Sequence, residues 1–154
     1  GAEPATETPG APRGASEVAP GRLRGRPIIV TIEPWHGNQL VLYTPSSNNG
    51  PPRDNSWQRR VLDRTLAEGH ALAVVDLDAD GRDEIVAGWR AAGGGLRVYC
   101  AADDDGRQFI ATDIDPKMPA EGVAIADLNA DGRPDIVAIS GRANRLAWYE
   151  NRSK

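Results

Sequence analysis

The sequence has 154 residues, which is about the length of one ordinary domain and enough to bury a hydrophobic core. Charged residues make up 26% of it and the formal net charge is only −4, so neither a nucleic acid nor an anionic membrane is indicated as a partner. No apolar run of about 18 residues occurs, which argues against a transmembrane helix, and the single Cys100 cannot form an intrachain disulfide.

Residues 1–25 are predicted to form a disordered tail or linker. They consist mainly of Ala, Pro, Gly, Glu and Thr, so they have few apolar side chains to bury. Burial therefore cannot offset the entropic cost of ordering the segment. They also contain no apolar stretch long enough for a signal peptide.

From residue 26 onward the sequence is typical of an all-β fold. Short runs of Val, Ile, Leu and Tyr alternate with Gly, Asn, Pro and Asp, and no segment keeps a helical period. One pattern, Gly-Arg followed by Ile-Val and then by Leu-x-x-Tyr, occurs three times. The copies begin at Gly25, Gly81 and Gly132 and end at Tyr43, Tyr99 and Tyr149. Such a period indicates repeated structural units.

Each unit reads as four antiparallel strands, which is the content of one β-propeller blade. The first strand leads into an Asp-rich loop, the third carries Leu-x-x-Tyr and the fourth ends in Asp. On this interpretation residues 26–150 hold about two and a half blades: a partial blade at 26–63, a full blade at 70–115 and a partial blade at 121–150. Because propellers close with about four to eight blades, we expect further blades from a longer chain or self-association.

The Asp-rich loops, residues 76–84 and 127–135, are predicted to bind Ca²⁺. Oxygen-bearing side chains occupy loop positions 1, 3, 5 and 9, and glycine at position 6 permits the chain to turn back around an ion. An EF-hand shares this opening but needs Glu at position 12 and flanking helices. Position 12 is Ala87 in one loop and Ala138 in the other, and the flanks read as strands, so the EF-hand alternative fails.

These loops and their flanks resemble the FG-GAP/VCBS repeats of integrin-type propellers over most of residues 26–150. The resemblance implies two structural Ca²⁺ ions in a protein found outside the cell, in the periplasm or at the cell surface. Glu84 is one methylene longer than Asp, which leaves Asp83 open as a substitute. The earlier copy has Pro20, Arg22 and Arg24 at the ligand positions and is expected to bind no metal. The implied ligands are Asp76, Asp78, Asp80, the Arg82 carbonyl and Glu84 in the first loop, and Asp127, Asn129, Asp131, the Arg133 carbonyl and Asp135 in the second.

Four further residues, Glu33, His36, His70 and Arg90, are predicted to lie on the face opposite the metal loops, and the carboxyl of Glu33 and the rings of His36 and His70 are expected to be partly exposed. Glu with two His could hold a transition metal, or act as an acid–base pair beside a carbohydrate platform of Trp35 and Trp89. The surrounding strings resemble, more weakly, propellers of the aldos-2-ulose dehydratase type, which act on keto-sugars. The alternative is structural: Glu33 and His36 shape a hairpin, and the tryptophans fill gaps between blades.

The sequence therefore favours a calcium-stabilised binding or scaffold module for protein or glycan partners. The alternative is the C-terminal part of a carbohydrate-active propeller enzyme, a sugar lyase or dehydratase, and the sequence does not decide whether the chain is an enzyme.

Overall fold

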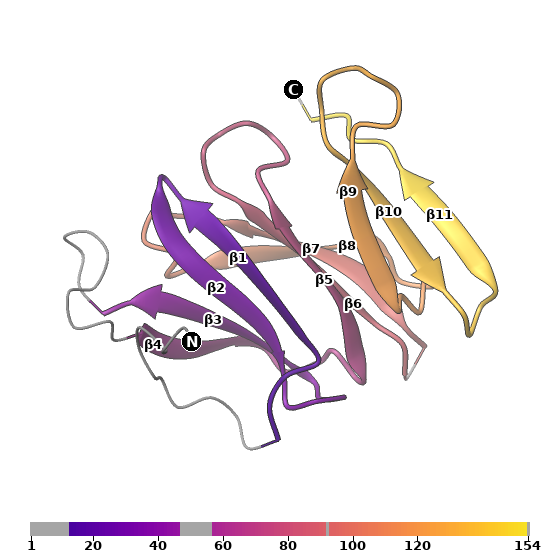
Figure 1. The fold of residues 1–154 in the computed structure, drawn as a ribbon, viewed down its shortest axis with the longest axis horizontal. Helices are drawn as coiled ribbons and strands as arrows, with labels where there is room; N and C mark the ends of the chain where they lie inside the picture. Colours follow the sequence, from indigo (N-terminus) through magenta and orange to yellow (C-terminus); the bar gives the residue numbers. More distant parts are fainter. Residues whose placement is uncertain (1–12, 47–56, 92, 154) are drawn as a thin grey trace, which may run out of the picture.

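The structure, a computed structural model, describes residues 13–46, 57–91 and 93–153, and these residues form three antiparallel sheets (Figure 1). The sheets contain four, four and three strands in sequence order. The predicted all-β fold is thus confirmed, and within the described residues the sheets do not close into a ring. The first sheet is β1 (Glu17–Leu23), β2 (Arg26–Glu33), β3 (Gln39–Pro45) and β4 (Trp57–Asp63); the second is β5 (Gly69–Val75), β6 (Glu84–Trp89), β7 (Gly95–Ala101) and β8 (Phe109–Asp115); the third is β9 (Gly122–Ala126), β10 (Asp135–Ser140) and β11 (Arg145–Tyr149).

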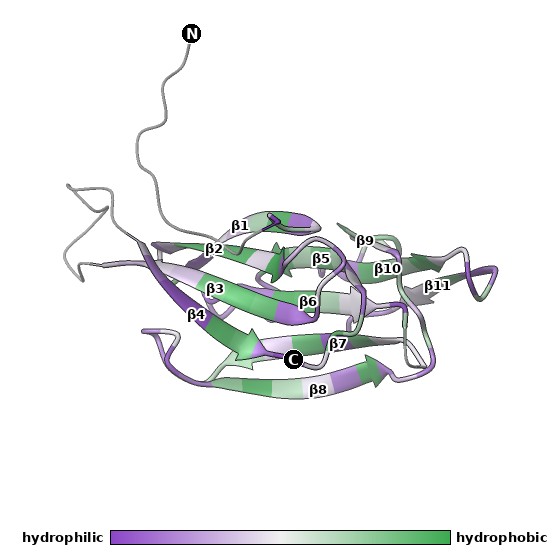
Figure 2. Cartoon of the chain, turned by 90° about the horizontal axis from the view of Figure 1, so that it is seen from below, coloured by the Kyte–Doolittle hydropathy of each residue, from purple (hydrophilic) through white to green (hydrophobic). Residues whose placement is uncertain are grey.

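The three sheets are stacked as repeated units. Their first strands, β1, β5 and β9, lie side by side along one side of the stack, and β4 and β8 lie along the other (Figure 2). The described residues include no helix of the length and hydrophobicity that a membrane crossing needs.

Strand β1 corrects the prediction of a disordered segment over residues 1–25. It pairs with β2 from Glu17↔Ile32 to Leu23↔Arg26, so the first sheet has four strands instead of the predicted three. A polar, proline-containing sequence is acceptable here because an edge strand contributes main-chain hydrogen bonds and needs few large side chains. Gly21 lets β1 approach the second sheet, since a Cβ there would lie 2.3 Å from Cγ1 of Val74. Residues 1–12 lie outside the described residues.

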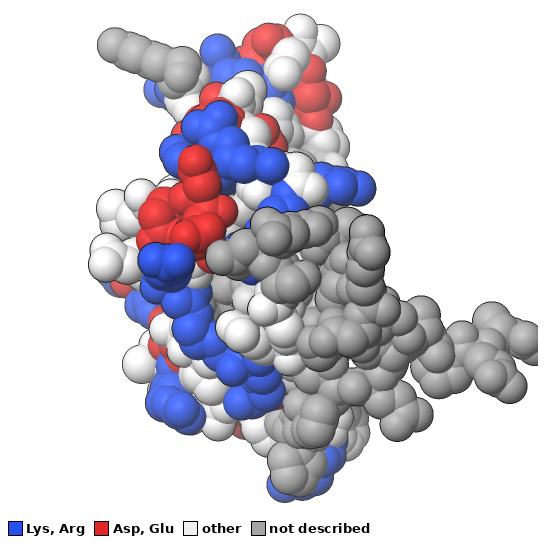
Figure 3. Space-filling view, turned by 90° about the vertical axis from the view of Figure 1, so that its left-hand side faces the viewer, with Lys and Arg blue, Asp and Glu red and all other residues white. Residues whose placement is uncertain are grey.

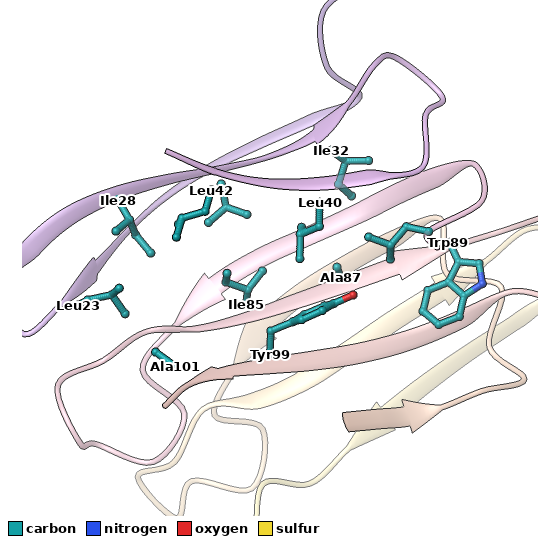
Figure 4. Close-up of a cluster of buried hydrophobic side chains, with 12 residues drawn as sticks. Leu23, Ile28, Ile32, Leu40, Leu42, Ile85, Ala87, Trp89, Tyr99 and Ala101 are labelled. Atoms are coloured by element: carbon teal, nitrogen blue, oxygen red, sulfur yellow. The ribbon is translucent and has the colours of Figure 1, made fainter. Parts of the chain in front are cut away.

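Each sheet has a front face, which points to the following sheet, and a back face, which points to the preceding one. The front of the first sheet packs on the back of the second, and the apolar side chains between them form one continuous core (Figure 4). A second core forms in the same way between the second and third sheets. The first core includes Ile28, Val30, Ile32, Leu40 and Leu42 against Ile85, Ala87 and Tyr99, and the second includes Ala71, Val86 and Leu96 against Ile136 and Ala138.

A polar latch also joins consecutive sheets. The carboxylate of Asp63, at the end of β4, accepts hydrogen bonds from the Tyr99 hydroxyl (2.7 Å) and the Arg97 guanidinium (2.8 Å) of β7. Asp115, at the end of β8, accepts a hydrogen bond from Tyr149 on β11 (2.9 Å) and pairs with Arg145 (3.0 Å). The repeated Leu-x-x-Tyr motif and the Asp that ends each fourth strand are therefore two halves of one contact.

Candidate metal centre

The two Asp-rich loops lie at the same edge of the stack, between β5 and β6 and between β9 and β10 (Figure 1). In the first loop, carboxylate oxygens of Asp76, Asp78 and Glu84 all lie within 4.8 Å of one another. This set offers only hard oxygen donors, which Ca²⁺ and Mg²⁺ prefer. Zn²⁺ and Cu²⁺ sites usually include nitrogen or sulfur donors. The first loop therefore holds an acidic triad that could bind a metal ion.

The backbone of the first loop is arranged by its own carboxylates. The amide of Asp80 donates to Asp76 Oδ1 (3.1 Å) and Asp78 Oδ1 (3.2 Å), and the amide of Gly81 donates to Asp76 Oδ2 (2.9 Å). Asp80 also pairs with the guanidinium of Arg82. Asp80 therefore lies beside the triad, and it would have to share its carboxylate between Arg82 and an ion.

The second loop repeats this arrangement contact by contact. The amide of Asp131 donates to Asp127 Oδ1 (3.1 Å) and Asn129 Oδ1 (3.1 Å), and the amide of Gly132 donates to Asp127 Oδ2 (2.8 Å). Two ligand positions differ: an amide, Asn129, replaces the second carboxylate, which removes a charge, and Asp135 replaces the longer Glu84. The second loop has the geometry of the first with a weaker negative field.

A left-handed residue at loop position 4 was not foreseen from the sequence. Ala79 and Ala130 each have φ of 59°, one residue before the Asp and two before the glycine whose φ is also positive. Alanine in this region is strained because its Cβ crowds the backbone, whereas glycine is not. Two alanines in the same strained position show that the loop geometry itself imposes the conformation.

We therefore expect Ala79→Gly and Ala130→Gly each to raise the free energy of unfolding by about 0.5–1 kcal/mol in saturating Ca²⁺. Ala124→Gly is the matched control: this alanine is exposed in the middle of β9, where glycine should cost about 0.5–1 kcal/mol. Urea unfolding of the three variants checks the signs. Equal destabilisation by all three would contradict the assignment of strain.

Glu84 is the buried member of the triad. Its side chain is almost inaccessible and accepts a hydrogen bond from the Leu77 amide (2.8 Å). Burial, together with the charges of Asp78, Asp80 and Asp76, raises the pKa of Glu84 to about 7, although the Leu77 amide opposes this shift. A cation at the triad would compensate the same charges, so metal binding below about pH 7 should displace a proton from Glu84.

Asp83, the alternative ligand, turns away from the triad. Its Oδ2 accepts a hydrogen bond from the Arg22 amide (2.7 Å), and its own amide donates to the Arg22 carbonyl (2.8 Å). The amide of Arg24 donates to the Gly81 carbonyl (2.7 Å), so the first loop is fastened to β1. The corresponding segment of the first sheet thus supports the neighbouring Asp-rich loop through the main chain of Arg22 and Arg24.

Asn151 connects the two loops from the other side. Its side-chain amide donates to the carbonyls of Leu77 (2.7 Å) in the first loop and Pro134 (3.0 Å) in the second. Its backbone amide donates to Asp135 (2.8 Å), which lowers the pKa of that carboxyl. The first loop is held on both flanks, and it is the better preorganised of the two for an ion.

Glu33 does not form the exposed acid–base group that the sequence suggested. Its carboxylate is buried, 2% exposed, and accepts hydrogen bonds from Thr31 (2.7 Å), Tyr43 (2.6 Å) and Arg59 (2.6 Å). Burial alone would raise the pKa of Glu33, but these donors outweigh it and lower the pKa. The prediction of partial exposure is wrong because Arg59, distant in sequence, supplies a counter-charge inside the sheet.

The structure brings His36 and His70 together at the edge opposite the metal loops. Their ring centroids lie 5.5 Å apart, and Trp35, which is exposed, lies 4.3 Å from His36. Arg90 directly follows the last residue of β6 and pairs with Glu68 (3.1 Å). The histidines are therefore neighbours, whereas Glu33 is turned into the sheet.

Trp89 fills a gap between strands, as the structural alternative suggested. It is 9% exposed, and a Cβ at Gly95 would lie 2.3 Å from its ring. The guanidinium of Arg97 covers the ring at 5.0 Å. Trp89 is therefore unavailable as a carbohydrate platform, and of the two predicted platform residues Trp35 remains exposed.

Comparison with known proteins supports the repeat. Residues 76–138 match the family model of the FG-GAP-like repeat. The match begins at Asp76, the first acid of the first loop, and ends in β10 after the second loop. No curated protein matched the chain. The chain therefore contains an FG-GAP-like repeat over residues 76–138, with one Asp-rich loop near each end of it.

Proposed function

We propose that this chain is a calcium-stabilised binding or scaffold module that packs a further β-sheet onto its third sheet. The observation that carries the proposal is the front face of that sheet, which is apolar and exposed. Across it, Val137 pairs with Trp148, and Ile139 pairs with Leu146. Trp148 is 51% exposed, Ile139 is 53% exposed and Leu146 is 70% exposed.

The same face is buried in the other two sheets. Val86 and Leu96 of the second sheet occupy the positions of Val137 and Leu146 in the repeat, and the third sheet covers them completely. The equivalent apolar face is covered by the next sheet in the first and second sheets and is exposed in the third, which indicates that a further sheet packs on it. A sheet that presents small and aromatic side chains, as the back of the third sheet does, would fit it.

The partner sheet can come from a longer chain or from a second copy, and protein and glycan ligands would then bind the completed surface. Calcium in the two loops would fix the edges of the stack. A location outside the cell, in the periplasm or at the cell surface suits this role, because extracellular calcium modules bind with dissociation constants of about 10⁻⁴–10⁻³ M.

We expect the chain to self-associate at tens of micromolar through this face. Leu146→Lys and Trp148→Lys should each weaken association by at least about tenfold, since a lysine buried in the contact would lack a partner. Ala111→Lys is the matched control, because Ala111 is exposed on β8 of the second sheet, outside the front face of the third. Sedimentation velocity over a concentration series measures the effect. A wild-type chain that stays monomeric, or an equal effect of Ala111→Lys, would contradict the proposed surface.

The carbohydrate-enzyme alternative depends on the pairing of His36 with His70 beside the exposed Trp35. With Glu33 committed to Arg59, a lyase or dehydratase would need the histidines as both acid and base. Sugar turnover by the protein that is lost in both His36→Ala and His70→Ala would support this alternative over the scaffold.

A further inference from the structure

A cavity of about 520 Å³ lies between the first sheet and the loop that joins β7 to β8. Its lining is strongly polar and includes the side chains of Arg26, Thr44, Gln58, Arg59, Arg60 and Arg107. Asp105 is the one acidic residue among the described residues that line it. We call this cavity the arginine pocket. Figure 3 shows Lys and Arg side chains in a band on this side of the molecule, with a patch of Asp and Glu side chains beside it.

The charges around the arginine pocket do not balance. Arg59 is neutralised by the buried Glu33 (2.6 Å), and Arg107 pairs with Asp105 (2.9 Å). Arg26 shares that same Asp105 only at 3.6 Å. Among the described residues, four guanidinium groups therefore meet two paired carboxylates, with the charge of Asp103 acting on Arg60 from beyond ion-pair distance, and the excess is positive.

Arg60 contributes most to this excess. It donates to the main-chain carbonyls of Arg107 (2.5 Å) and Gly106 and forms no ion pair with any described residue. Burial lowers the pKa of Arg60, as expected for a cation that carbonyl dipoles solvate only in part. An anion in the pocket would supply the missing counter-charge.

Arg26 adds an unused donor. Its Nη2 donates to the Pro45 carbonyl (3.0 Å), but its Nε is buried and has no acceptor. A buried N–H group without a partner is rare and costs free energy, so the described residues satisfy this guanidinium incompletely. The Nε atom itself is closed to solvent, and an anion in the pocket would be met by the terminal Nη groups of Arg26. Guanidinium groups match the oxygens of phosphate and sulfate with two parallel hydrogen bonds.

We infer that the arginine pocket binds a sulfate or phosphate group. The cavity is far larger than one such ion and lies within the range of sites for whole small ligands. Its polar walls suit a hydroxylated carrier, so the group is expected to be an ester on a sugar. This inference does not depend on the docking of a further sheet, because the pocket and the front face of the third sheet share no residue.

The test is a titration of the full chain, followed by calorimetry and by amide chemical shifts, with four probes: inorganic sulfate, inorganic phosphate, glucose 6-sulfate and glucose. We expect saturable millimolar binding of the anions, tighter binding of the ester than of the free ion, and no binding of glucose. Equal binding of ester and free ion would still support the anion site and would identify the free ion as its ligand.

Arg26→Gln and Arg107→Gln should each weaken sulfate binding at least fivefold, and raised salt should weaken it in the wild type. Arg60→Gln is expected to abolish sulfate binding, and circular dichroism must show that this variant is folded. If it is not folded, Arg26→Gln and Arg107→Gln test the inference. Arg152→Gln is the matched control, because that side chain is 80% exposed and lies outside the pocket. Absence of saturable binding by every anion, or an equal loss in Arg152→Gln, would overturn the inference.

Discussion

Removal of calcium with EGTA should lower the stability of this chain by about 2–3 kcal/mol for each occupied loop, when the reference state has free Ca²⁺ about a hundredfold above the dissociation constant. The reason is that the folded state alone presents the triad of Asp76, Asp78 and Glu84, whereas the unfolded chain disperses it. Thermal melts at about pH 8, where Glu84 is ionised, should show the full difference. Mg²⁺ should give a smaller shift, because it needs a tighter octahedral shell.

Asp76→Asn and Asp127→Asn should each remove the calcium-dependent shift of one loop. In EGTA the same variants should be somewhat less stable than the wild type, because Asn offers one acceptor oxygen where the carboxylate accepts two backbone hydrogen bonds, a loss that relieved repulsion between carboxylates offsets in part. The calcium-dependent shift of each variant, measured against its own melt in EGTA, therefore separates loss of a ligand from damage to the loop. Glu17→Gln is the control, since Glu17 lies on β1 outside both loops. A melting temperature that does not respond to EGTA, in the wild type as in the variants, would exclude the metal sites.

The loops were predictable because their chemistry is local. The spacing of Asp, Asn and Gly within nine residues is the spacing that a loop around one ion needs, and three of the residues it singled out, Asp76, Asp78 and Glu84, do lie together. The strands around them were predictable because the same pattern occurs three times. The left-handed conformation of Ala79 and Ala130 could not be predicted, because alanine, unlike glycine, does not indicate a positive φ.

The parts that sequence reasoning missed depend on distant partners or on the main chain. The sequence of β1 resembles a disordered tail because the strand is held by backbone hydrogen bonds and by the close approach that Gly21 permits. Glu33 was predicted to be a reactive acid because no residue near it in the sequence indicates its ion pair with Arg59. The latch between sheets could have been predicted from the sequence, because the pair of Tyr99 and Asp63 is repeated one unit later as Tyr149 and Asp115.

That latch carries the second large effect, which we expect from Asp63→Ala. Asp63 is 11% exposed and is the acceptor for both the Tyr99 hydroxyl and the Arg97 guanidinium, and its loss would leave the buried hydroxyl without a partner. Removing one partner from a buried hydrogen-bonded charge costs about 2–4 kcal/mol. Asp113→Ala is the matched control: Asp113 pairs with the same Arg97 but is 42% exposed, and it should cost less than about 1 kcal/mol.

The pH dependence identifies the charge of Asp63 as the cause. Burial alone would raise the pKa of Asp63, but the hydrogen bonds from Tyr99, Thr65 and Arg97 outweigh it, so the pKa is lower in the folded chain than in the unfolded one. A lowered pKa contributes stability that is present above the unfolded value, about 3.9, and is lost as the pH falls towards the folded value. Asp63→Asn should therefore differ most from the wild type at pH 7 and least at about pH 3. Urea unfolding at the two values measures this, and a difference that stays constant between them would show that the latch acts through packing instead of charge.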